Sequence, residues 1–168
     1  MTLLFLLLLL MAPYLILILM GKWITGFNLA PSKRARVGIS LSFIFTSIGH
    51  FIRTEEMAAM IPPSIPYRVE LIYLTGVFEL LGAIGVWVPP LVRLTGLLLI
   101  LMLLGLLPAN IYSAINRVDF GGHGIGPAYL LVRVPFQLFV IWWIYFATEQ
   151  AWFHRMAKPN NSLNPTAR

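Results

Sequence analysis

Cysteine is absent from this 168-residue sequence, and charged side chains are scarce. Without a thiol, the chain can form no disulfide, persulfide or thiolate metal site, and it cannot ligate an iron–sulfur cluster. Only 11% of the residues are charged, whereas about a quarter are charged in a typical soluble domain. This shortage of charge argues against a water-soluble fold.

Apolar residues take the place of the missing charges, with 59% of the chain apolar and a mean hydropathy of +0.84. Several apolar runs can cross a hydrocarbon core of about 30 Å at about 1.5 Å per helical residue. The sequence therefore predicts an all-α integral membrane protein, built as a bundle of about five transmembrane helices. We expect these spans at residues 3–20, 37–52, 71–88, 94–115 and 127–147.

The first apolar run is open to two interpretations, a signal peptide or a retained helix. Pro13 interrupts it, no Lys or Arg precedes it, and no small-x-small cleavage pattern follows it before Lys22. We therefore expect a retained first span. The bundle should form one domain over residues 1–150, followed by a polar, disordered cytoplasmic tail at 151–168.

The net charge of +6 comes from basic residues that lie mostly in loops between the apolar runs. This distribution is typical of membrane topology and argues against nucleic-acid binding. With five spans, most Lys and Arg residues fall in the loops on one side, and Arg133 falls inside a span. The positive-inside rule then places the N-terminus outside and the C-terminus in the cytoplasm.

Polar side chains inside the spans are the best candidates for function. An ionisable group at the centre of a membrane helix costs about 3 kcal/mol or more, so it normally faces a partner or a cavity. Glu79 lies near the middle of its span, and the other candidates lie in the outer half of the membrane. We expect these side chains to turn inwards and form a polar pocket open to the outer face, with Glu79 and Arg133 as its charged pair. The five candidates are His50, Glu79, Asn110, Arg133 and Gln137.

Two interpretations of this cluster remain open. In the structural one, Arg133 neutralises Glu79, and the other three side chains complete the hydrogen bonds. In the functional one, the same groups hold a small ligand, such as a quinone head group or a carboxylate. Only one histidine, His50, lies within a span, so two-histidine haem ligation is excluded, and no metal site is expected.

Two other polar segments have little claim to a function. The glycine-rich loop at 116–126 lacks the preceding strand and the Lys-Ser/Thr pair of a phosphate-binding loop. We interpret its glycines as turn formers, and this leaves His123 little claim to a functional role. Ser42 and Thr46, four residues apart before His50, are interpreted as small polar groups that help helices to pack.

Five segments in order resemble the DoxX-like family of small bacterial membrane proteins, over most of Val37 to Ala147. These are GHF at 49–51, MIPPSIP at 60–66, LTGVFELLGAIG at 74–85, PANIY at 108–112 and RVPFQ at 133–137 with the following IWW. The resemblance implies a helical bundle in the bacterial cytoplasmic (inner) membrane, with a four-helix core to which the first span is additional. It also implies an association with quinone-linked oxidoreductases.

The leading hypothesis is therefore a membrane subunit or small-ligand protein that binds a quinone through the five polar side chains. Any redox activity would be that of a quinone-linked oxidoreductase subunit working with a partner subunit. Apart from the bilayer, we expect as partners such a subunit or a second copy of the chain. The alternatives are a small proton- or cation-coupled transporter that uses Glu79, and a structural scaffold with no ligand.

Overall fold

The computed structural model describes residues 2–24 and 29–156, with side chains up to residue 149. Helices make up all the regular structure of these residues, and they contain no strand, which confirms the all-α prediction. The short elements are α3 (Thr54–Ala58), η1 (His123–Ile125) and η2 (Pro127–Tyr129). The long helices are α1 (Thr2–Trp23), α2 (Pro31–Ile52), α4 (Arg68–Gly85), α5 (Val92–Ile115) and α6 (Leu130–Met156).

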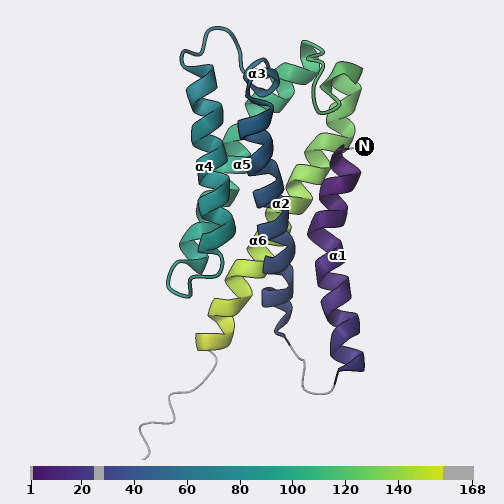
Figure 1. Ribbon diagram of the computed structural model, residues 1–168, viewed down its shortest axis with the longest axis vertical. Coiled ribbons are helices and arrows are strands. Elements are labelled where there is room, and N and C mark those ends of the chain that lie inside the picture. The colour runs from purple at the N-terminus through teal and green to yellow at the C-terminus, as the bar shows by residue number, and fades with distance from the viewer. Residues whose placement is uncertain (1, 25–28, 157–168) are drawn as a thin grey trace, which may run out of the picture.

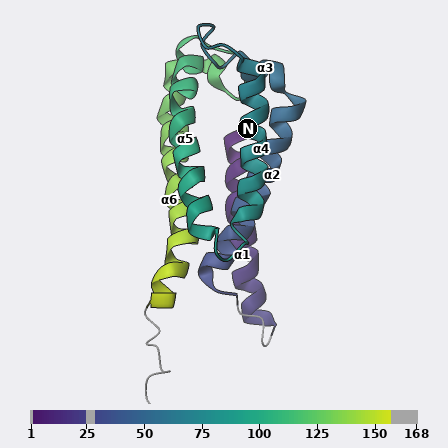
Figure 2. The same ribbon diagram turned by 90° about the vertical axis from the view of Figure 1, so that its left-hand side faces the viewer.

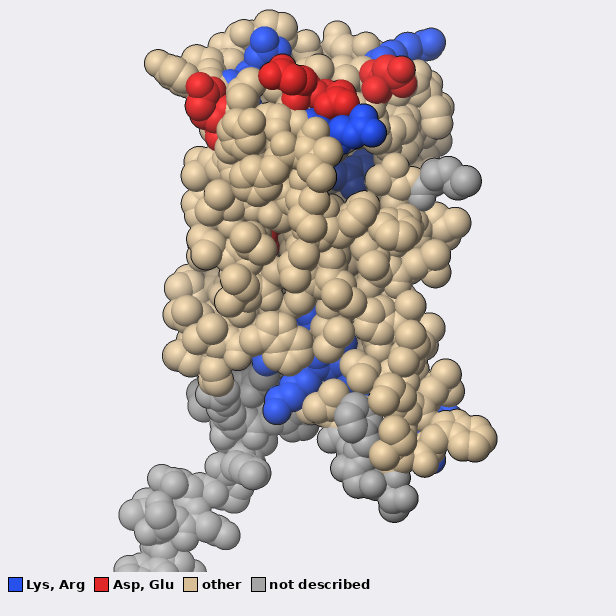
Figure 3. All heavy atoms as spheres, in the orientation of Figure 1, with Lys and Arg blue, Asp and Glu red and all other residues tan. Residues whose placement is uncertain are grey.

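The long helices run alternately up and down in one elongated bundle (Figures 1 and 2). The connection from α2 to α4, with α3 in it, and the connection from α5 to α6 lie at one end, called here the α3 end. The connection from α4 to α5 lies at the opposite end. Acidic side chains gather at the α3 end in the space-filling view, and basic side chains are seen near the opposite end (Figure 3).

Four helices of the described residues are long and apolar enough to cross a membrane: α1, α2, α5 and the segment Pro127–Glu149. They indicate a membrane protein, as the composition predicts. The remaining long helix, α4, has 18 residues and includes Arg68, Glu70 and Glu79. Helix α2 also has three charges, at Lys33, Arg34 and Arg36, but it is long enough to contain an apolar stretch of 18 residues with only one of them, which the shorter α4 is not.

Two helix boundaries at the end of the bundle opposite the α3 end differ most from the predicted ones. Helix α2 begins at Pro31 rather than at residue 37, because proline fits the first turn of a helix, where its missing N–H is not needed. Helix α6 continues to Met156, into the segment 151–168 that was expected to be a disordered tail. Residues 157–168 lie outside the described residues.

The apolar core fills the half of the bundle away from the α3 end. There α2 packs against α1, α4 and α6, and α5 packs against both α4 and α6. The tight packing of this half leaves the α3 half of the bundle for polar side chains and a cavity. The core side chains come from all five long helices and include Leu10, Ile39, Phe43, Ala83, Leu99 and Ile144.

Two helices approach closely at Gly38, where α2 meets the backbone of α1. A Cβ atom added at Gly38 would collide with the carbonyl group of Leu10, which is 1% exposed. Glycine allows such backbone contact between membrane helices. Gly105 in α5 is the opposite case, since nothing lies within 4 Å of an added Cβ there.

Gly38→Ala should therefore destabilise the protein by about 1–3 kcal/mol, because overpacking forces backbone shifts. Gly105→Ala is the matched control, and it should be neutral or stabilising by up to about 1 kcal/mol through helix propensity. Equilibrium unfolding by SDS titration in mixed micelles measures both. Equal effects of the two substitutions would contradict the packing argument.

Candidate functional site

A cavity of about 890 Å³ occupies the α3 half of the bundle. Its volume lies within the range of roughly 300–1,000 Å³ typical of small-molecule sites. Its wall includes residues of all five long helices, of α3 and the connection that follows it, and of η1 and η2. Most of the lining is apolar, with side chains such as Leu3, Leu6, Phe43, Met102, Leu106 and Phe136. All five predicted site residues, His50, Glu79, Asn110, Arg133 and Gln137, also line it.

Glu79 faces His50 across the contact between α4 and α2. Glu79 is 4% exposed and His50 is 7% exposed, and Glu79 Oε1 lies 3.6 Å from His50 Nε2. His50 Nδ1 lies 2.9 Å from the carbonyl oxygen of Ile72 and 3.0 Å from the hydroxyl oxygen of Thr75. The imidazole ring is thus held between polar atoms of α4 on one side and the Glu79 carboxyl group on the other.

Glu79 and Arg133, predicted as the charged pair, form no direct ion pair among the described side chains, although their charges interact at longer range. Arg133 Nε instead donates to Asn110 Oδ1 over 3.3 Å. The physical reason is helix packing. Helix α4 packs against α2, α3 and α5, whereas α6 packs against α5 and α2. His50 on α2 therefore meets Glu79 directly, while Arg133 on α6 meets its neighbour on α5.

Asn110 and Gln137 form a hydrogen-bonded link between α5 and α6, called here the amide bridge. Both side chains are 3% exposed. Asn110 Nδ2 donates to the carbonyl of Leu106 over 3.1 Å and to Gln137 Oε1 over 3.4 Å. Gln137 Nε2 donates to the carbonyl of Leu103 over 2.6 Å. Three of the four amide N–H groups of this bridge are thus engaged within the protein.

Three buried polar atoms in the cavity lining have no hydrogen-bond partner within the described part of the chain. They are Ser42 Oγ, Glu79 Oε2 and His123 Nε2. An unsatisfied buried polar atom costs about 1–3 kcal/mol, so such atoms call for an explanation. A ligand that supplies the missing hydrogen bonds is one such explanation.

His123 is a site residue that the sequence analysis missed. It lies in η1, is 3% exposed, and its Nδ1 donates to the carbonyl of Phe120 over 2.8 Å. Tyr129 packs edge-on against its ring at 4.8 Å between centroids, and the Tyr129 hydroxyl donates to Gly121 over 2.7 Å. A Cβ atom at Gly122 would lie 2.8 Å from the Tyr129 ring. The glycines therefore fold the loop tightly enough to bring His123 to the cavity.

Burial lowers the pKa of His123 below its ordinary value of 6.5, and the nearby Arg133 acts in the same direction. A lowered pKa means that the unfolded chain binds this proton better than the folded one. The stability that His123 contributes is present above pH 6.5 and is lost as the pH falls. In His123→Asn, the amide can still donate to Phe120 but does not titrate. We therefore expect its melting temperature in detergent to fall less below pH 6.5 than that of the parent protein. An identical fall in both proteins would contradict this.

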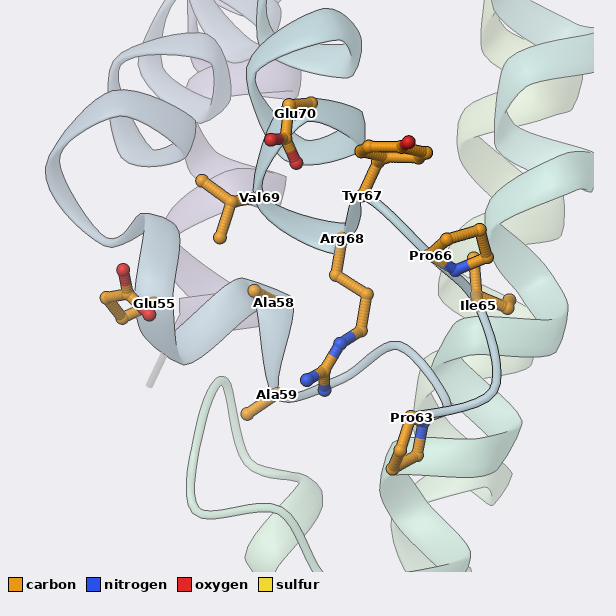
Figure 4. Close-up of a pocket in the computed structure, with 10 residues that line it drawn as sticks. All are labelled: Glu55, Ala58, Ala59, Pro63, Ile65, Pro66, Tyr67, Arg68, Val69 and Glu70. Atoms are coloured by element: carbon orange, nitrogen blue, oxygen red, sulfur yellow. The ribbon is translucent and has the colours of Figure 1, made fainter.

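A second, more open pocket of about 620 Å³ lies at the α3 end. Its polar side chains, Glu55, Arg68 and Glu70, extend in different directions around it (Figure 4). Glu55, Tyr67 and Glu70 are exposed. Because the polar groups do not converge, the larger cavity is the better candidate for a binding site.

No curated protein and no solved structure matches this chain. A family model does match it, over residues 39–148, which is more than half of the sequence. The matched segment runs from α2 into α6, so it includes all five predicted site residues and His123 as well. The chain belongs to the family described as Domain of unknown function (DUF8561).

Proposed function

We propose that this protein binds a lipid-soluble small molecule of the quinone type in the large cavity. One observation carries the proposal: buried polar atoms without partners lie in the wall of a mostly apolar cavity of about 890 Å³. An apolar pocket with a few polar groups suits a molecule with a polar head and an apolar tail. His50 and Glu79 place two ionisable side chains beside that head group.

The position of α1 supports a ligand that comes from the lipid phase. Tyr14 of α1 packs edge-on against Trp143 of α6, with ring centroids 5.1 Å apart, which closes the bundle below the cavity. Nearer the start of α1, Leu3 and Leu6 line the cavity, while Leu4 is exposed on the outside. Helix α1 also begins below the level of α3 (Figures 1 and 2). One apolar helix thus separates this part of the cavity from lipid.

We propose that α4 is the fifth membrane span. Its 18 residues extend roughly 27 Å at the usual helical rise. Arg68 and Glu70 lie in its first turn at the α3 end, and Glu79 is buried against His50. The outward face of the helix is apolar, as a lipid-facing surface requires. Its exposed side chains include Leu74, Val77, Phe78, Leu81 and Ile84.

In this arrangement the protein lies in the bacterial cytoplasmic membrane with the α3 end outside. The positive-inside rule supports this orientation. The resemblance to the DoxX-like family supports the same location, with α1 added to a four-helix core. A reporter fused after Arg168 tests the orientation. A fused green fluorescent protein should be fluorescent and a fused alkaline phosphatase inactive, because the C-terminus would lie in the cytoplasm. The reverse pattern would contradict the orientation.

Redox activity would depend on a partner subunit. The chain has no cysteine for an iron–sulfur cluster, and its own contribution would be to hold the quinone. A second copy of this chain is a further possible neighbour in such a complex. Copurification of a redox subunit with the protein from its native membrane would support this part of the proposal.

Gly105→Phe tests whether the cavity is the binding site. Gly105 lines the cavity, and an added Cβ there meets nothing within 4 Å. A phenyl ring should therefore occupy the cavity without displacing a helix. Isothermal titration calorimetry in detergent measures the binding of decylubiquinone. We expect saturable binding to the parent protein and at least tenfold weaker binding to Gly105→Phe. Gly105→Ala is the control and should bind like the parent protein. Failure of the parent protein to bind either redox form of decylubiquinone would overturn the proposed function.

A further inference from the structure

We propose that the cavity selects a head group that donates hydrogen bonds, so that it binds the hydroquinone form of its ligand in preference to the quinone form. This inference rests on the proposed function and specifies the chemistry of the same site. It follows from which polar atoms of the lining are already engaged and which are not.

The first unsatisfied atom is Glu79 Oε2, on the carboxyl group that faces His50. As a carboxylate beside the imidazole ring, Glu79 can only accept hydrogen bonds. Oε2 is buried and has no partner among the described residues. A donor from the ligand would satisfy it.

The second unsatisfied atom, His123 Nε2, is an acceptor because of the loop geometry. His123 Nδ1 lies 2.8 Å from the carbonyl oxygen of Phe120, so Nδ1 carries the proton of the neutral ring. Nε2 is then a bare nitrogen with a lone pair. It is buried in the cavity lining with no donor beside it in the described part of the structure.

The amide donors of the lining, by contrast, are mostly engaged. The amide bridge directs the Asn110 and Gln137 amide groups to Leu106, Leu103 and each other. Arg133 is held by Asn110 through Nε, and its terminal N–H groups supply positive charge and donors to the site. The lining therefore combines two unsatisfied acceptors with the Arg133 guanidinium and with the hydroxyl of Ser42, which can both donate and accept.

A hydroxyl group fits this pattern better than a carbonyl group does. A hydroxyl can donate to Glu79 or His123 and accept from a guanidinium at the same time, whereas a quinone carbonyl can only accept. A quinone would leave both acceptors unsatisfied, and its oxygen lone pairs would be repelled by any acceptor that they approach. The two hydroxyls of a hydroquinone could satisfy two acceptors.

The test compares the two redox forms of one compound on the full-length protein. Decylubiquinone and the same compound reduced by borohydride, with excess reductant removed and kept under argon, are titrated by calorimetry. We expect the reduced form to bind at least tenfold more tightly. Equal affinities, or tighter binding of the oxidised form, would overturn this inference and leave the proposed function standing. Binding of neither form would overturn the proposed function itself.

Variants at position 123 test the assignment of the acceptor. His123→Asn keeps a donor for Phe120 but has no atom at the position of Nε2, so the hydroquinone should bind about tenfold more weakly while the quinone is unaffected. His123→Gln places an amide oxygen near that position and should retain most of the affinity. Ser40→Ala removes a hydroxyl that bonds to Ala83 outside the cavity and serves as the control. Equal losses for both redox forms in His123→Asn would contradict a donor-selective site.

Discussion

His50→Asn should destabilise the protein by about 3–5 kcal/mol, the loss expected when one member of a buried charged pair is removed. The asparagine amide can still donate to the carbonyl of Ile72, which His50 Nδ1 contacts at 2.9 Å. The variant has no group at the position of Nε2, which faces Glu79, a residue that is 4% exposed. The carboxyl group is then buried without the imidazole beside it. SDS titration of the purified protein in mixed micelles measures the loss.

The double variant His50→Asn/Glu79→Leu should be less destabilised than the two single changes predict together. Removing both partners leaves neither a buried charge nor an unsatisfied imidazole nitrogen. We expect an interaction free energy of about 1–3 kcal/mol in the double-mutant cycle, as for residues in direct contact. Strictly additive effects would show that the contact at 3.6 Å between His50 and Glu79 contributes nothing.

A second cycle distinguishes this pairing from the one that charge alone predicts. Arg133→Leu and Glu79→Leu should show a smaller interaction free energy than His50→Asn and Glu79→Leu, because Arg133 bonds to Asn110 and acts on Glu79 only through a longer-range charge interaction. A larger interaction free energy between Arg133 and Glu79 than between His50 and Glu79 would instead support the pairing of Glu79 with Arg133. The two cycles share Glu79→Leu, so they are directly comparable.

The fold was predictable where hydrophobic patterning decides it. Apolar runs of sufficient length predict helices, and α1, α2, α5 and the segment Pro127–Glu149 meet the requirements of a span. The boundaries were less predictable. The start of α2 at Pro31 adds a basic, polar first turn to an apolar run, and hydropathy does not register such a turn.

The site was predictable as a set of residues but not as a set of contacts. Intramembrane polar groups must turn away from lipid, so the five candidates were expected to converge, and all of them line one cavity. Their partners depend on which helices are neighbours. The contact of α2 with α4 brings His50 to Glu79, whereas complementary charge alone favoured Arg133 as the partner of Glu79. Sequence order does not specify these neighbours.

His123 illustrates a different limit of sequence analysis. Its loop reads as a turn, because glycine-rich segments are usually turns, and the turn is indeed there. The loop also folds inwards through contacts of Tyr129, whose hydroxyl donates to Gly121. The sequence did contain one indication of this structure, since a histidine and a tyrosine lie among and beside the clustered glycines. Their contact with each other and with the cavity depends on the tertiary structure.

Gln137→Leu should also be strongly destabilising, by about 1–3 kcal/mol for each polar group that it leaves unsatisfied. Two groups are affected. The carbonyl of Leu103 loses a donor at 2.6 Å, and Asn110 Nδ2 loses its contact with Gln137 Oε1. Both lie in the lipid-embedded part of the proposed bundle, where water cannot replace the lost bonds. Equilibrium unfolding in mixed micelles measures the loss.

Pro108 lies in the same turn of α5 as the carbonyl that Gln137 bonds. Proline has no N–H, so it cannot donate to the carbonyl of Leu104, and its ring strains the preceding turn of the helix. The amide of Gln137 bonds to the adjacent carbonyl, that of Leu103, and so supports the strained turn from outside. Pro108→Ala restores a backbone donor and removes this strain. We therefore expect Gln137→Leu to cost at most half as much stability in the Pro108→Ala background as in the parent protein. Equal costs in the two backgrounds would show that the amide bridge and the proline act independently.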